Sequence, residues 1–284
     1  MGLFNNYEKP GKGVRKDEKR KKGPALYFEL LFRKFGSYFK LNLTYMVTCT
    51  PAFLVLFFIS GYVLQELIQK EQALAILPII ISFFLTSLFS LSPFSSGYYY
   101  ILRNFSEERH AWLFSDFAEQ FAKNRSKSLI TFFIDLFAVS AFLIFSRVYI
   151  MSAFFISKIF FVPYAVLVLA LITYKNMMTY KWTMIVTLDL NLRTIYKNAF
   201  LLVMCELPTT LKYMFWEIIY FGIFGFLFYQ IEMLGFLLYI LIGISGLGLI
   251  QQLCFFTQFR KYFLGGKTIN EVLNEKQENE KTEE

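Results

Sequence analysis

Side chains that could do chemistry are few in this sequence, and their spacing fits no catalytic pattern. The one histidine, His110, has no second histidine or cysteine at metal-site spacing, and it follows Glu108 and Arg109 as in a solvated helix start. No glycine-rich phosphate loop, paired-histidine motif or nucleophile elbow occurs. We therefore expect a chain that is not an enzyme and that holds no cofactor and no metal ion. The cysteines give no disulfide framework: Cys49, Cys205 and Cys254.

An acidic residue within an apolar run is more informative. Asp135 lies about six residues into such a run, which places it about 9 Å deep at 1.5 Å of rise per residue. Ionisable residues inside membrane helices often mark ion or substrate paths. Two interpretations stay open: a carboxylate that water or a lysine reaches, or a polar contact with another helix or a substrate. The apolar runs hold no string of charges, which argues against a proton-driven pump.

The composition indicates a membrane protein. Apolar residues make up 56% of the 284 residues, with 36 Phe and 18 Tyr, and the mean hydropathy is +0.46. A helix needs about 20 apolar residues to cross the hydrocarbon core. We expect an all-α integral membrane protein with about six transmembrane helices arranged as three hairpins. The expected spans are Leu41–Val63, Ala73–Leu91, Leu129–Ser146, Phe155–Tyr174, Trp216–Tyr229 and Leu234–Phe256.

Basic residues alternate between the connections and predict the orientation. Lys and Arg are frequent before the first expected span, in the third connection and around Lys175–Lys212, and sparse in between. Because cytoplasmic connections carry this excess, we expect a multi-pass protein of the bacterial plasma membrane with both termini in the cytoplasm. The net charge of +8 then reflects topology and attraction to anionic lipid headgroups. No stacking platform or groove-reading motif accompanies the bases, so we expect no nucleic-acid binding.

The chain divides into three regions by composition. Residues 1–24 are basic and rich in Gly and Pro, and they are predicted to form a disordered cytoplasmic tail. Residues 25–263 form the polytopic membrane domain. Residues 264–284 are acidic and polar, and they are predicted to form a second cytoplasmic tail.

Amphipathic segments precede three of the expected spans. Residues 25–40 interleave apolar and basic positions, Leu113, Phe117 and Phe121 recur at a spacing of four, and residues 191–204 repeat this design. We expect each segment to form a helix in the membrane interface.

These segments resemble one another. Each places two bulky apolar residues four apart, followed by a lysine and an asparagine: Lys40 and Asn42, Lys123 and Asn124, Lys197 and Asn198. One interpretation is a threefold repeat in which each unit is an interfacial helix followed by a transmembrane hairpin. The other is that any cytoplasmic start of a span favours an amphipathic helix and a lysine.

Other residue types mark special points of the spans and their ends. Prolines within spans predict kinks: Pro51, Pro78 and Pro163. Small residues predict a close-packing face on the last span: Gly243, Ser245, Gly246 and Gly248. Aromatic residues of the third connection fit the headgroup level: Tyr98–Tyr100 and Trp112.

Several short motifs resemble the YesL family of bacterial integral membrane proteins. In the third connection they are Arg103-Asn104-Phe105, Glu108, His110-Ala111 and Ser115-Asp116-Phe117. Further along they are Val186-Thr187-Leu188-Asp189-Leu190 and Ile195-Tyr196-Lys197-Asn198-Ala199. Ser92 stands where the family usually has Gly. The biochemical activity of this family is unknown, and its genes commonly lie beside sugar-uptake systems, which implies an accessory role in carbohydrate uptake.

These observations favour a non-enzymatic accessory or regulatory membrane protein whose cytoplasmic connections dock a sugar transporter or sensor complex. Two alternatives stay open: a transporter or channel in its own right, and a lipid-surface scaffold protein. The candidate partner-docking or polar membrane positions are Arg103, Asn104, Glu108, His110, Asp116, Asp135, Asp189, Lys197 and Asn198.

Overall fold

The computed structural model describes residues 23–69 and 92–263, and every regular element in them is a helix, which confirms the expected all-α class for this part of the chain. The second expected span, Ala73–Leu91, and nearly all of both tails lie outside the described residues. In chain order the elements are α1 (Pro24–Arg33), α2 (Phe35–Gln69), α4 (Ser95–Ser106), α5 (Leu113–Lys123), α6 (Arg125–Phe155), η1 (Lys158–Phe160), α7 (Phe161–Thr187), α8 (Leu192–Cys205), α9 (Leu207–Gln230), α10 (Glu232–Leu238), the π-helical turn η2 (Tyr239–Gly243) and α11 (Ile244–Phe263).

The described residues include four helical segments that are long and apolar enough to cross a membrane, so the chain is a membrane protein. The first expected span lies within α2. The four segments overlap the last four expected spans and are Arg125–Phe155, Lys158–Thr187, Leu207–Gln230 and Leu241–Phe259.

The expected boundary between the third and fourth spans is wrong. No break follows Ser146, because α6 continues to Phe155 and the turn comes at residues 156–160. Arg147, whose charge favours a loop, is buried in α6 with 8% of its surface exposed, and an apolar run resumes directly after it. As a result, α7 begins later than expected and ends well beyond Tyr174, at Thr187.

The prolines differ from one another. Pro51 lies inside α2, as expected. Pro163 lies in the first turn of α7, where backbone N–H groups have no partner within the helix, so it is not a proline of the helix interior. Pro78 lies outside the described residues.

Three times along the chain, a short helix runs into a long one through a single non-helical residue. The break residues are Lys34, Asn124 and Glu206, which end α1, α5 and α8 respectively. Their backbone angles are alike, with φ of −119°, −106° and −114° and ψ of 28°, 16° and 38°. The expected helices at residues 113–123 and 191–204 are thus confirmed, and the same local geometry supports the threefold interpretation.

The burial pattern after each break also repeats. The fourth residue beyond the break is buried in every unit (Tyr38, Ser128 and Thr210), and so is the fifteenth (Cys49, Val139 and Phe221). The eleventh residue is buried as well, and it is polar or charged each time: Tyr45, Asp135 and Glu217. The Lys-Asn pairs do not share this register, because Lys40 and Asn42 lie within α2, Lys197 and Asn198 lie within α8, and only Asn124 is a break.

The core forms where α4, the second half of α7 and α11 meet. Tyr99 stacks on Trp182 with ring centroids 6.2 Å apart, and its hydroxyl donates to Gln251 over 3.3 Å. Tyr98 stacks on Tyr45 at 3.7 Å. Tyr98 and Tyr99 are therefore core residues rather than headgroup-level aromatics, whereas Trp112 is 70% exposed and remains compatible with the interface.

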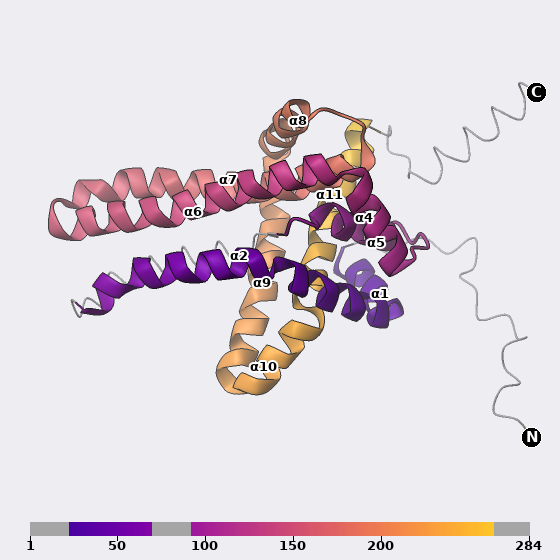
Figure 1. Ribbon diagram of the computed structural model, residues 1–284, viewed down its shortest axis with the longest axis horizontal. Coiled ribbons are helices and arrows are strands. Elements are labelled where there is room, and N and C mark those ends of the chain that lie inside the picture. The colour runs from indigo at the N-terminus through magenta and orange to yellow at the C-terminus, as the bar shows by residue number, and fades with distance from the viewer. Residues whose placement is uncertain (1–22, 70–91, 264–284) are drawn as a thin grey trace, which may run out of the picture.

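The long helices leave this core in two directions (Figure 1). α6 and α7 run side by side and project with α2 toward one side of the view, whereas α9 and α10 run toward the bottom before α11 returns. The hairpins that the described residues complete therefore diverge from a shared core.

Close backbone approaches fix the packing around α4. A Cβ at Gly97 would lie 2.5 Å from the Phe117 carbonyl oxygen of α5, so only glycine fits there. In α11, a Cβ at Gly248 would lie 2.5 Å from the Tyr98 hydroxyl, and one at Gly246 would lie 2.4 Å from the Tyr220 hydroxyl. The expected close-packing face of the last span is confirmed at these two glycines.

We predict that Gly97→Ala destabilises the protein by about 1–3 kcal/mol, because α5 must move away from α4 to accept the added methyl group. The measurement is thermal unfolding of the purified protein in detergent, followed by tryptophan fluorescence. The matched control is Gly222→Ala, a helical glycine with open space around it. Equal unfolding temperatures for the two variants would contradict the prediction.

Candidate functional site

Two lysines of α7 are buried among the helices, and each forms an ion pair with an acid from a different helix. Lys181 pairs with Asp135 of α6, and Lys175 pairs with Glu217 of α9. All four side chains are at most 4% exposed. The sequence assigned both lysines to a basic connection, which is wrong because α7 extends past them to Thr187.

The position of these lysines follows from helix geometry. Six residues separate Lys175 from Lys181, which places them on different faces of a helix with 3.6 residues per turn. Lys181 faces α6, which precedes α7 in the same hairpin, and Lys175 faces α9, so α7 links its own hairpin partner to the next long helix. Asp135 lies about 15 Å along α6 from its start at Arg125.

Aromatic residues surround the Asp135–Lys181 pair. The Tyr174 hydroxyl donates to Asp135 Oδ1 over 2.7 Å, and the Lys181 ammonium lies 4.7 Å and 4.8 Å from the ring centres of Tyr174 and Tyr196. Trp182 is close enough to interact with the carboxylate, although its Nε1 makes no hydrogen bond of ordinary geometry. Asp135 therefore has a lysine within reach and also makes a polar contact between helices, so features of both interpretations are present.

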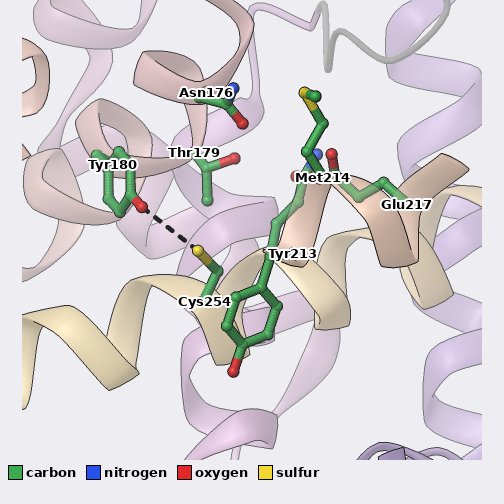
Figure 2. A pocket seen from close by; sticks show the side chains of 8 residues that line it. Asn176, Thr179, Tyr180, Tyr213, Met214, Glu217 and Cys254 are labelled. Atoms are coloured by element: carbon green, nitrogen blue, oxygen red, sulfur yellow. Dashed lines mark hydrogen bonds between the residues drawn. The ribbon is translucent and has the colours of Figure 1, made fainter. Parts of the chain in front are cut away.

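A small cavity adjoins the second pair. Glu217 lines it together with Asn176, Thr179, Met214 and Cys254, as Figure 2 shows. The Tyr180 hydroxyl and the Cys254 thiol share a hydrogen bond beside it. Its volume is enough for about one water molecule. Several lining residues carry polar groups, but most of the surface that they expose to the cavity is apolar, and the cavity has no room for a sugar.

Buried pairs of this kind fix the arrangement of helices more than they add stability. Removing two charges from water costs several kcal/mol per ion, and the attraction between them offsets this only with close contact. Separating either lysine from its acid would leave an unpaired charge in an apolar surrounding. Within the described ranges 23–69 and 92–263, no group of His, Cys, Asp and Glu could hold a metal ion.

The connection after α4 is anchored by charged groups. Arg103 donates to the Val186 carbonyl oxygen of α7 over 2.9 Å and lies over the Tyr100 ring, and burial lowers the pKa of Arg103. Its neighbour Asn104 is buried and accepts from it. Glu108 has a positive φ of 63° and binds Arg33 of α1 at 2.8 Å. These residues therefore act first as structural ties.

The remaining candidate residues lie at the surface. His110 is exposed and packs edge-on against Trp112, at 4.8 Å between ring centres. Asp116 accepts from the Trp112 backbone N–H over 2.9 Å and so caps the start of α5. Asp189, Lys197 and Asn198 belong to the α7–α8 connection and α8: the first two are exposed and Asn198 is half-buried.

Each of the three units is closed by a charged contact between its start and its end. In the first, Arg33 binds Glu108; in the second, Lys127 lies 3.3 Å from Asp189. In the third the charges are reversed, because the acid Glu206 is at the start and Lys261 is at the end. The bonds from Lys261 and Tyr262 lower the pKa of Glu206 to about 2.

The chain matches no family model, curated protein or solved structure. Its resemblance to the YesL family therefore remains a prediction, and the site is interpreted from its own geometry. That geometry contains three residues which sequence reasoning missed: Lys175, Lys181 and Glu217. A usable signal existed, because the apolar pattern continues past Lys181 through Trp182, Met184 and Ile185.

We predict that Asp135→Asn destabilises the protein by about 3–5 kcal/mol, because it leaves the Lys181 charge buried and unpaired. The double variant Asp135→Asn/Lys181→Met should recover most of this loss, since it removes both charges. Unfolding in detergent would be compared for the two, with Asp189→Asn as the control for an exposed pair. A double variant no more stable than Asp135→Asn would contradict this explanation.

We predict that the Glu206 contact stabilises the fold at neutral pH and is lost in acid. Its pKa is lowered in the folded state, so the stabilisation is complete above the ordinary value near 4.5 and disappears as the pH falls through about 2. The unfolding temperatures of wild type and Glu206→Gln should differ at pH 7 and converge near pH 2. A difference that persists unchanged across this range would show that the carboxylate does not act through its charge.

Proposed function

We propose that this chain is a non-enzymatic accessory protein of the bacterial plasma membrane that docks a component of a carbohydrate-uptake system. In this proposal it belongs to the YesL family, crosses the membrane six times as three hairpins and keeps both termini in the cytoplasm. The alternation of basic connections supports the orientation, and the motifs quoted above support the family.

The observation that carries the proposal is that the two patterned connections lie together. Arg103 of α4 contacts the end of α7 at Val186, and Lys127 at the start of α6 contacts Asp189 in the connection after α7. Distinctive residues that are far apart in the sequence therefore belong to one surface. In the first of these connections His110 and Trp112 form an exposed aromatic pair, which suits a protein partner.

The rival proposal, a transporter or channel, has weaker support. The buried acids Asp135 and Glu217 are each neutralised by a lysine of α7. The cavity beside Glu217 has room for about one water molecule, whereas small-molecule pockets are usually about 300 Å³ or larger.

Purification of the tagged protein from its own membranes tests the docking proposal. We expect wild type to retain a sugar-transport component identified by mass spectrometry, and His110→Ala/Trp112→Ala to lose most of it. The matched control is Phe137→Ala, which removes an exposed aromatic ring from the middle of a span. Wild-type protein free of any sugar-transport component, in detergent that preserves known complexes, would refute the proposal.

The rival is tested with the same purified protein in proteoliposomes. Accessory function predicts sugar flux no higher than in empty vesicles, for wild type and for Asp135→Asn alike. Flux that wild type supports and Asp135→Asn loses would favour the transporter.

A further inference from the structure

The three short helices that precede the long ones are alike in position but differ in charge. α1 carries Glu29 and Arg33, and α5 carries two acids and one base. α8 carries Arg193 and Lys197 and no acid. Among these three equivalent helices, α8 is therefore the one with an excess of positive charge.

The outer face of α8 combines this charge with apolar side chains in a particular order. Arg193 and Lys197 are exposed near its start, and Phe200, Leu201 and Met204 are 42–46% exposed near its end. Residues 193, 197, 200 and 204 follow one another at intervals of three or four, so they share one face of the helix. Bases come first and apolar groups follow, on the side that leads into the membrane helix α9.

The placement of α8 fits a position at the membrane surface. In Figure 1, α8 is seen nearly end-on above the start of α9, and α9 runs down from it. Only Glu206 separates the two helices, so α8 lies across the point where the chain enters the apolar layer. A helix that lies in the interface buries its apolar residues below the headgroups and keeps its bases among them.

We propose that the outer face of α8 binds the anionic headgroups of the surrounding lipid, with Arg193 and Lys197 reaching phosphate and with Phe200, Leu201 and Met204 beside them against the acyl chains. The occupant is lipid because exposed apolar groups and exposed bases share one face of a helix that leads into a span, and long basic side chains can reach up to phosphate while their stems stay against apolar groups. The inner face of α8 places Tyr196 over the buried ammonium of Lys181, at 4.8 Å from the ring centre. Lipid bound outside therefore holds one wall of the Asp135–Lys181 site in position.

The natural cysteines make this testable in the full-length protein. Cys205, at the end of α8, is exposed, whereas Cys49 and Cys254 are buried, so a spin label directs itself to α8. The labelled protein is placed in nanodiscs of zwitterionic lipid alone or with anionic lipid added. The two-component spectrum of the spin label gives the ratio of immobilised to mobile label in each kind of nanodisc.

We expect anionic lipid to raise this ratio by roughly five-fold for each base engaged, and added salt to reverse the rise. Arg193→Gln/Lys197→Gln should give equal ratios in both kinds of disc. The matched control, Lys158→Gln, removes an exposed base at the far turn between α6 and α7 and should respond as wild type does. A label on α5, at Ser115→Cys in a Cys205→Ser background, should not respond to anionic lipid.

Equal ratios for wild type in the two kinds of disc would overturn the proposal. So would a response that survives Arg193→Gln/Lys197→Gln, or one that the α5 label shares, because either would be a general effect of the lipid. The discs contain no other protein, so these outcomes do not depend on the partner proposed above.

Discussion

The central constraint of this fold is that α7 carries two lysines into an apolar surrounding. An unpaired ammonium there would cost several kcal/mol, so each must meet an acid at the same depth on a neighbouring helix. Asp135 supplies one from α6 and Glu217 supplies the other from α9. The Lys175–Glu217 pair therefore sets the third unit against the second through a requirement for neutrality, which is stricter than the packing of similar apolar side chains.

The repeated units show how one scaffold accommodates different chemistry. Eleven residues after each break the chain places a side chain into the core, as Tyr45, Asp135 or Glu217. In the first unit the contact is neutral, because Tyr45 and Ser95 share a hydrogen bond of 2.7 Å. In the other two it is an ion pair. The backbone geometry is shared, whereas the strength and specificity of the contact differ from unit to unit.

Sequence patterns predicted the helical elements better than the contacts between them. The helical class, the helices α5 and α8 and the close-packing glycines Gly246 and Gly248 follow from composition and periodicity. The error at Arg147 and the two α7 lysines has one cause: each base was interpreted as a loop residue, although a helix can bury a base. For the two lysines, an acid that is distant in the sequence neutralises the buried charge. Lys175 and Glu217 are 42 positions apart in the sequence, and Lys181 and Asp135 are 46 apart. Pairing over such separations leaves no local sequence pattern.

The reversed charges of the third unit have a consequence for assembly. A wrong closure between the start of the third unit and the end of the first or second would bring Glu206 against Glu108 or Asp189, two acids in either case. The opposite error would bring Lys261 against Arg33 or Lys127, two bases. Three similar units in one chain could exchange ends as they insert, and like-charge repulsion opposes every exchange that involves the third. The polarity of these contacts thus distinguishes the third unit from the other two.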